Sequence, residues 1–284
     1  MLSGAFLHVQ KIYNMFGFQY TTIINKLTIL GIFLLLLTFY ISLSNFLLRL
    51  DVKKHALYRE DDYKTMPFQM THLHIAKNIY KLFPEKINNL PQFYLGNIAP
   101  DGVHNREGYI SDWKKASHLC VGDEPWGLIS NNDEWIKNVQ KFLINHRDSN
   151  DFYFILGYCC HILSDIYNNI AVWTPFLRKN PDQWGKGYSG VYHQESEKVD
   201  KILFLRDENK DDFWVYLEKA RPIDLCDFIS AEEIEKHKEN LLYNWYKDKE
   251  LPDISAHKLI TLESINNFIE GATNFIVSKI ASLI

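Results

Sequence analysis

Two residues able to do chemistry, His161 and Asp165, lie four positions apart in a segment that is otherwise almost wholly apolar. Residues four apart share one face of an α-helix, so the imidazole and the carboxylate are expected to project toward the same point. An ionised carboxylate in apolar surroundings needs a partner, because burying an unpaired charge is costly. The spacing leaves two partners open: a divalent cation bound by both side chains, or a hydrogen bond between them. Gly157, one turn earlier, is predicted to permit close approach of another helix.

A second pair of histidines, His72 and His74, is separated by two positions and therefore points to nearly opposite sides of a helix. His72 shares the apolar face with Ile75 and Ile79, whereas His74 shares the polar face with Lys81. We therefore predict that His72 faces the core and that His74 is solvated. A single inward histidine is usually only a core residue unless other ligands converge on it.

Two further candidate ligands lie between these helices. Asp101 directly follows Pro100, a position at which an aspartate usually forms a turn or caps a helix. His118 follows Ser117 in a stretch rich in lysine, where a histidine is usually exposed. Taken singly, neither residue indicates a site.

In chain order, however, four motifs resemble those of the zinc-dependent phospholipase C family. They are Thr71-His72-x-x-Ile75-Ala76, Leu95-Gly-x-x-Ala-Pro-Asp101, Ser117-His118 and Leu156-Gly-x-x-x-His161-x-x-x-Asp165. The resemblance runs from about Met66 to Asp200. It implies an all-helical fold, which the family shares with zinc nucleases that cut single-stranded nucleic acid.

The resemblance also implies a set of metal ligands. One zinc ion would be surrounded by Asp101, His118, His161 and Asp165. Asp165 would bridge to a second ion, which His72 would bind. The nitrogen and oxygen ligands suit zinc, although iron or manganese would fit the same set.

A later metal site of the family uses a His-x-x-x-acid pair, which here is implied to be His193 and Glu197. The surrounding helix is strongly charged, so an exposed histidine beside a glutamate is the alternative. A further family histidine falls on Ala171, which cannot bind metal. We therefore expect one or two zinc ions rather than three.

A zinc ion held by these ligands would indicate phosphodiester hydrolysis as the reaction. Zinc lowers the pKa of a bound water toward neutrality and offsets charge on phosphoryl oxygens. Asp101 is the candidate catalytic residue, because it is placed to orient that water or to accept its proton. The chain is accordingly predicted to be a zinc-dependent hydrolase, and a non-catalytic metal-binding membrane protein is the alternative.

The elements that must position these residues are predicted to be helices. Apolar residues recur at spacings of three and four in 69–83, 133–146, 151–172, 192–205, 231–247 and 258–283, with no sustained two-residue alternation. The fold class is therefore all-α, a multi-helix phospholipase C-like bundle. The amphipathic segment 258–283 is predicted to pack on the core rather than lie on a membrane surface.

The N-terminal quarter differs in composition, since residues 27–48 contain no charged side chain. This length of uncharged helix spans a bilayer. We predict an N-terminal segment (1–26), a transmembrane helix (27–48), a connector (49–65) and the helical domain (66–284). The protein is thus expected to be a single-pass membrane protein, and the flanking basic residues do not fix on which side the domain lies.

The charge balance limits the classes of partner that the protein can bind. The chain has a net charge of −4, and residues 66–284 carry 24 Lys/Arg against 31 Asp/Glu, a net charge of −7. No broad basic surface is available for duplex nucleic acid. The anchor would hold the domain beside membrane lipid, which favours a phospholipid substrate, while a nuclease or phosphatase on the same scaffold is the alternative. No protein partner can be identified.

Overall fold

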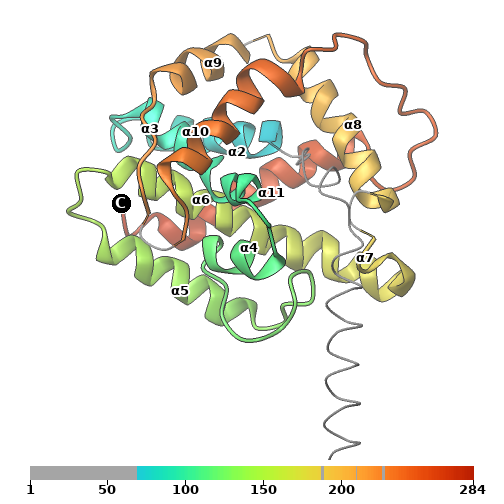
Figure 1. The fold of residues 1–284 in the computed structure, drawn as a ribbon, viewed down its shortest axis with the longest axis horizontal. Helices are drawn as coiled ribbons and strands as arrows, with labels where there is room; N and C mark the ends of the chain where they lie inside the picture. The colour runs from blue at the N-terminus through green and yellow to red at the C-terminus, as the bar shows by residue number, and fades with distance from the viewer. Residues whose placement is uncertain (1–68, 187–188, 209, 226–227) are drawn as a thin grey trace, which may run out of the picture. The chain divides into compact units, whose positions relative to one another are not determined.

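The structure is a computed structural model that describes residues 69–284 apart from 187–188, 209 and 226–227 (Figure 1). The predicted segments 1–26, 27–48 and 49–65 lie outside the described residues, and so does the predicted transmembrane helix. Within the described residues, no helix has the length and apolar character needed to cross a bilayer. All of the described residues fall within one compact unit of the chain.

The described part of the chain is helical and contains no β-strand, as the sequence periodicity predicts. Its α-helices are α2 (Gln69–Leu82), α3 (Leu90–Gly96), α4 (Ser111–Ser117), α5 (Asn132–Asn145), α6 (Phe152–Asn168), α7 (Thr174–Lys179), α8 (Val191–Arg206), α9 (Lys210–Lys219), α10 (Ala231–Asn240) and α11 (Leu262–Ile280). A 3-10 helix, Ala99–Asn105, follows α3. All six predicted segments contain a helix, while α3, α4, α7 and α9 were not predicted.

The predicted helix 151–172 is wrong at its C-terminal end. Regular α-helix ends at Asn168, a π-helical turn covers Asn169–Trp173, and α7 begins at Thr174. Pro175 has no backbone N–H to donate, so an uninterrupted α-helical ladder cannot continue through this point. The predicted helix 231–247 also passes into a π-helical turn, at Leu241–Trp245.

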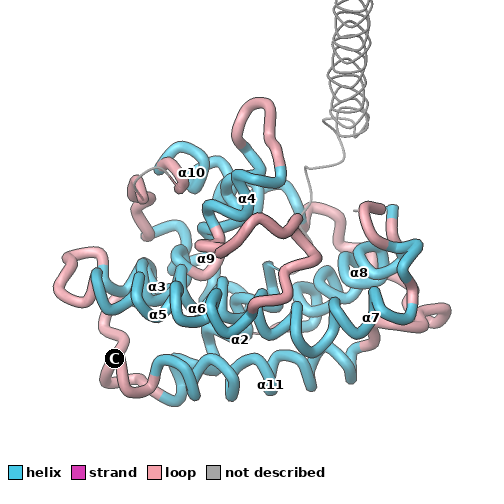
Figure 2. Tube along the Cα trace, turned by 90° about the horizontal axis from the view of Figure 1, so that it is seen from below, coloured by secondary structure: helices cyan, strands magenta, loops and turns pink. Residues whose placement is uncertain are grey.

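Helix α11 covers one side of the described unit, against α2 and α6 (Figure 2). It begins with a capping box in which Thr261 and Ser264 satisfy each other's backbone N–H groups. Its apolar face is buried, including Ile265, Ile269 and Ile276. The prediction that this segment packs on the core is confirmed.

Helices α3 and α6 approach each other more closely than side chains allow, and two glycines make the contact possible. A Cβ atom on Gly157 would lie 2.1 Å from the carbonyl oxygen of Phe93, and one on Gly96 would lie 2.1 Å from that of Phe154. The close approach predicted for Gly157 is confirmed. It matters for the site, because the carbonyl at the end of α3 reaches a histidine on α6.

We expect Gly157→Ala to destabilise the fold by about 2 kcal/mol or more, because the added methyl group meets backbone atoms rather than a flexible side chain. Denaturant unfolding measures this change. Asn266→Ala, at an exposed position of α11, is the control and should change stability by less than about 0.5 kcal/mol. Equal stabilities for the two variants would contradict the assigned contact.

Candidate metal centre

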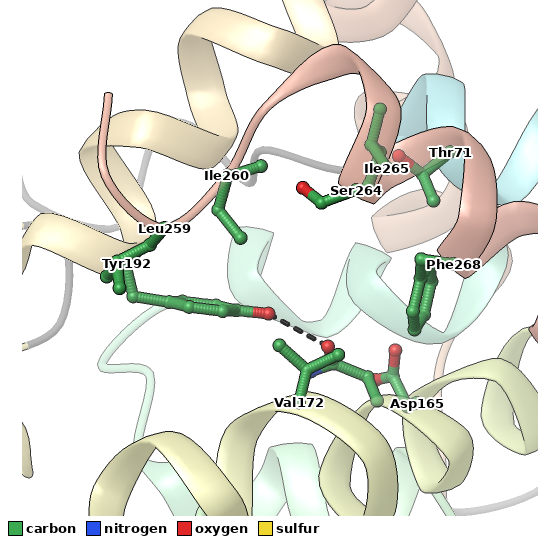
Figure 3. Close-up of a pocket in the computed structure, with 10 residues that line it drawn as sticks. Thr71, Asp165, Val172, Tyr192, Leu259, Ile260, Ser264, Ile265 and Phe268 are labelled. Carbon is green, nitrogen blue, oxygen red and sulfur yellow. Dashed lines mark hydrogen bonds between the residues drawn. The ribbon is translucent and has the colours of Figure 1, made fainter. Parts of the chain in front are cut away.

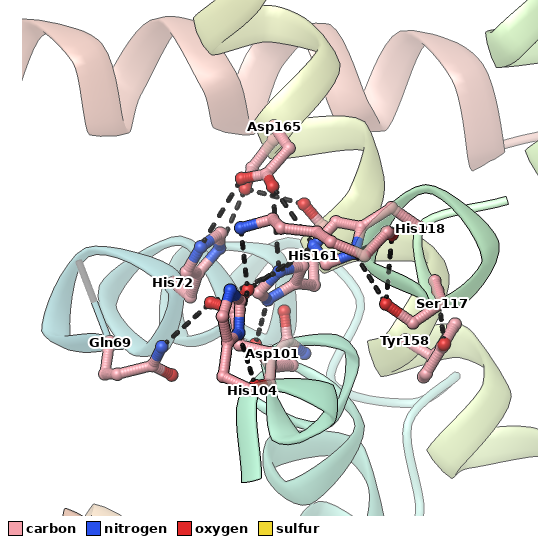
Figure 4. A network of polar contacts seen from close by, with 12 residues as sticks. Gln69, His72, Asp101, His104, Ser117, His118, Tyr158, His161 and Asp165 are labelled. Carbon is pink, nitrogen blue, oxygen red and sulfur yellow. Dashed lines mark hydrogen bonds and ion pairs between the residues drawn. The ribbon is translucent and has the colours of Figure 1, made fainter. Parts of the chain in front are cut away.

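Five of the predicted ligands converge on one point, although they come from four separate segments (Figure 4). His72 lies on α2, Asp101 on the 3-10 helix, His118 at the C-terminal cap of α4, and His161 with Asp165 on α6. His118 and His161 are fully buried, and Asp101 is 2% exposed. The side chain of Asp165 is the most accessible of the five, at 20%.

Neighbouring donor atoms at the centre of this cluster lie within 4 Å of one another. The Nε2 atoms of His118 and His161 are 3.3 Å apart. Asp165 Oδ2 lies 3.3 Å from His118 Nε2 and 3.9 Å from His161 Nε2. On the opposite side, Asp101 Oδ1 is 3.5 Å from His118 Nε2, and its Oδ2 is 3.8 Å from His161 Nε2. Two nitrogens and two carboxylates thus surround a common space.

The hydrogen bonds of the outer ring nitrogens determine the tautomers of these two histidines. His118 Nδ1 lies 2.9 Å from the carbonyl oxygen of Lys114, and His161 Nδ1 lies 2.8 Å from that of Asn97. A carbonyl oxygen only accepts hydrogen bonds, so each Nδ1 must carry the proton and donate it. In a neutral imidazole the Nε2 atom then has a free lone pair.

His72 follows the same rule through a serine. The Ser164 hydroxyl donates to the carbonyl oxygen of His161 at 2.8 Å, and it lies 2.8 Å from His72 Nδ1. Because the hydroxyl proton is already used, Ser164 accepts from His72 Nδ1–H. The Nε2 lone pair of His72 therefore faces the cluster, 3.6 Å from Asp165 Oδ1.

These tautomers decide between the two partners that the His161/Asp165 spacing left open. The distance of 3.9 Å between His161 Nε2 and Asp165 Oδ2 is too long for a hydrogen bond, and the nitrogen carries no proton. The Nε2 atoms of His118 and His161, 3.3 Å apart, face the same space as the two carboxylates. The donor set therefore fits a cation.

The two oxygens of Asp165 face different histidines. Oδ2 lies toward His118 and His161, whereas Oδ1 lies toward His72. The rings of His72 and His161 are stacked, with centroids 3.8 Å apart and planes 15° apart. Two groupings of the described residues can each hold an ion: His118, His161 and Asp165; and His72, Asp101 and His161. This geometry is compatible with one ion or two.

Burial and neighbouring charges set the protonation states. Burial lowers the pKa of His72 and, more strongly, that of His161, so both rings are neutral at neutral pH. For Asp101, burial acts to raise the pKa, but Lys114 and His161 outweigh it and hold the value well below its ordinary range. The pKa of Asp165 is also lowered, against the effect of burial, by His118 and His161. Both carboxylates are therefore ionised.

The structure does not bring His193 and Glu197 into this cluster. Glu197 is exposed on α8, and neither residue belongs to the groupings of described residues that can hold an ion. His193 is half-buried with its ring against Trp173 and Tyr192, and burial lowers its pKa to about 4. Metal binding by this pair stays a prediction.

The prediction that His74 is solvated is wrong. Its side chain is 22% exposed, its Nε2 lies 3.4 Å from Asp207 Oδ2, and its ring packs edge-on against Phe213. Helix α9 covers this face of α2, and the short α9 was not predicted. His74 nevertheless points away from the metal cluster, as its helical position requires.

Several residues that organise the centre were not predicted. Gln69 Nε2 donates to Asp101 Oδ2 at 3.0 Å, and Lys114 Nζ lies 3.1 Å from Asp101 Oδ1. Lys114 lies one helical turn before His118, and Ser164 one turn after His161, so their spacing offered a signal. The carbonyl of Asn97 offered none, because backbone groups are present in every residue.

A cavity of about 100 Å³ opens beside Asp165 (Figure 3). Its lining is mostly apolar, with a few polar groups near the cluster. The lining residues are Thr71, Asp165, Asn168, Val172, Tyr192, Leu259, Ile260, Ser264, Ile265 and Phe268. Asn168 accepts a hydrogen bond of 2.8 Å from the Tyr192 hydroxyl across this space.

One wall of the cavity is held by a buried carboxylate. Glu195 accepts backbone N–H groups from Lys258, Leu259 and Ile260 at 2.7–2.9 Å, and Leu259 and Ile260 line the cavity. Although burial acts to raise the pKa of Glu195, these three hydrogen bonds lower it below its ordinary value. Of the acids in the segment 193–197, it is Glu195 that is buried.

Comparison with known proteins agrees with the resemblance drawn from the motifs. Residues 71–168, about a third of the chain, match a family model described as zinc dependent phospholipase C. The match includes all five converging ligands and ends before His193 and Glu197. Zinc is the cofactor that this family implies. No curated protein and no solved structure matches the chain.

We expect His161→Ala to abolish stoichiometric zinc binding, because it removes the nitrogen that faces both carboxylates. Ser164→Ala should weaken zinc binding about tenfold, since it leaves the His72 ring without its acceptor. Zinc per chain and the affinity in competition with a chelator measure both effects. His74→Ala is the control and should retain zinc; equal losses in His161→Ala and His74→Ala would refute the assignment.

We expect Glu195→Ala to cost about 2 kcal/mol or more in unfolding free energy, because three backbone donors lose a charged acceptor. Denaturant unfolding of metal-free protein isolates this contribution from ligand binding. Glu197→Ala, two positions further along the same helix and exposed, should change stability by less than about 0.5 kcal/mol. A similar small loss in both variants would mean that the loop 258–260 does not depend on Glu195.

Proposed function

Taking residues 71–168 as a zinc dependent phospholipase C segment, we propose that the chain is a zinc-dependent phosphodiesterase that hydrolyses phospholipids. The observation that carries this proposal is the convergence of three Nε2 atoms with two carboxylates on one buried space. Buried carboxylates need cations or hydrogen-bond donors that offset their charge. The family match supports a phospholipase C-like hydrolase. Our proposal adds two points to it, the phospholipid substrate and the membrane anchor.

Zinc suits the donors that the centre offers. Imidazole nitrogen and carboxylate oxygen are its usual ligands, and the second hydrogen bond on each ring is the usual support for a zinc-binding histidine. His118, His161, Asp101 and Asp165 would hold the principal ion, and His72 with Asp165 would hold any second ion. When bound, zinc acts as a Lewis acid that activates water and offsets charge on a phosphoryl oxygen.

The remaining roles in the reaction belong to side chains of the protein. Asp165 borders the cavity and is the most exposed ligand, so substrate would reach the centre from that side. Asp101 is held by Gln69 and Lys114, and its low pKa makes it a poor proton acceptor. Of the two roles expected for Asp101, orientation of the attacking water is therefore the one that we favour.

The cavity favours a lipid over a polynucleotide. Six of its ten lining residues are apolar or aromatic, and none is Lys or Arg. A polyanionic strand would need basic groups along its path, whereas the glycerol and first acyl carbons of a phospholipid suit apolar walls. An anchor formed by residues 27–48 would keep the protein at the membrane that contains such a substrate.

The test uses the purified full-length chain with measured zinc content. We expect hydrolysis of phosphatidylcholine with release of phosphocholine, loss of activity on chelation, and recovery with zinc. Single-stranded DNA should not be cleaved. Nuclease activity in place of lipid hydrolysis would identify the alternative enzyme on this scaffold. A zinc-loaded protein inert toward both would instead support the non-catalytic membrane protein.

A further inference from the structure

One buried cation lies against the metal centre without belonging to the ligand set. Lys114 is 6% exposed, and its Nζ is 3.1 Å from Asp101 Oδ1. The ammonium group also lies 4.6 Å from the centre of the Trp126 ring, and that ring packs edge-on against His118. Lysine is rarely buried to this degree unless it is paired, so the burial of Lys114 depends on these contacts with Asp101 and Trp126.

Helix α4 fixes the ammonium group and a metal ligand together. Lys114 lies four positions before His118, and its carbonyl oxygen accepts the Nδ1–H of that histidine at 2.9 Å. The Ser117 hydroxyl donates to the same carbonyl at 3.1 Å. The backbone of Lys114 thus orients the His118 ring while its side chain reaches Asp101. The ammonium group cannot be moved far without disturbing a ligand.

The ammonium group lies beside a carboxylate that also faces the histidines of the centre. Asp101 Oδ1 is 3.1 Å from Lys114 Nζ and 3.5 Å from His118 Nε2. A phosphoryl oxygen that approached a metal ion in this centre would therefore come close to the Lys114 ammonium group.

We propose that Lys114 binds a phosphoryl oxygen of the substrate beside the metal centre. This inference rests on the proposed function for the reaction but not for anion binding itself. An ammonium group is a common phosphate ligand, because it is a compact charge with three donors. One of these donors is directed to Asp101, which leaves the others for an anion bound beside that carboxylate.

Inorganic phosphate is the probe, and its affinity for the zinc-loaded full-length protein is measured by calorimetry. Lys114→Met keeps an unbranched side chain against Trp126 but removes the charge, and we expect phosphate to bind about tenfold more weakly or worse. Lys114→Arg keeps the charge and should stay within about threefold of the unmodified protein. Lys115→Met, the adjacent residue on α4, should leave the affinity unchanged.

The zinc content of each variant distinguishes phosphate binding by Lys114 from a role in which Lys114 only holds Asp101 in place. Retained zinc with weakened phosphate binding in Lys114→Met supports the inference. Retained zinc with unchanged phosphate binding overturns it. Loss of zinc from Lys114→Met but not from Lys114→Arg also overturns it, because the lysine would then act only by holding Asp101.

The two proposals can fail separately. If the protein hydrolyses phosphatidylcholine while Lys114→Met leaves phosphate affinity intact, the role of Lys114 fails and the proposed function stands. If no lipid is hydrolysed but phosphate binding depends on Lys114, the proposed function fails and the anion site stands.

Discussion

The structure of the centre depends on the hydrogen bonds that hold the outer nitrogen of each histidine. Backbone carbonyls of Asn97 and Lys114 accept from His161 and His118, and Ser164 accepts from His72. Each bond fixes the tautomer, and each directs an Nε2 lone pair inward. Without these acceptors a ring could turn or protonate at Nε2, and the carboxylates would form ordinary ion pairs. The fold therefore determines the chemistry through groups that do not touch the metal.

Helix packing provides the acceptors. The Asn97 carbonyl reaches His161 because α3 and α6 meet at Gly96 and Gly157, where even a methyl group would overlap the facing backbone. A glycine contact within the core thus controls the orientation of a ligand. The contact that lets the two helices approach therefore also positions the acceptor of a predicted metal ligand.

A lysine lies beside the carboxylates of the centre. Lys114 Nζ is 3.1 Å from Asp101 Oδ1. Glu197, by contrast, is exposed, and position 171 is an alanine. The mostly apolar cavity lies on the other flank of the cluster and has Asp165 in its lining.

The sequence alone indicated the helical class and the close approach at Gly157, because periodicity and glycine placement depend on residues near one another in the chain. The resemblance of four motifs implied seven ligands, of which five converge in the structure. Tertiary structure decided the rest. In the folded chain, Lys114 and Gln69 are the partners of Asp101. Helix α9 packs against His74. On α8, Glu195 is buried and Glu197 is not. These outcomes depend on which segments meet across the core, and long-range packing leaves no periodic trace in the sequence.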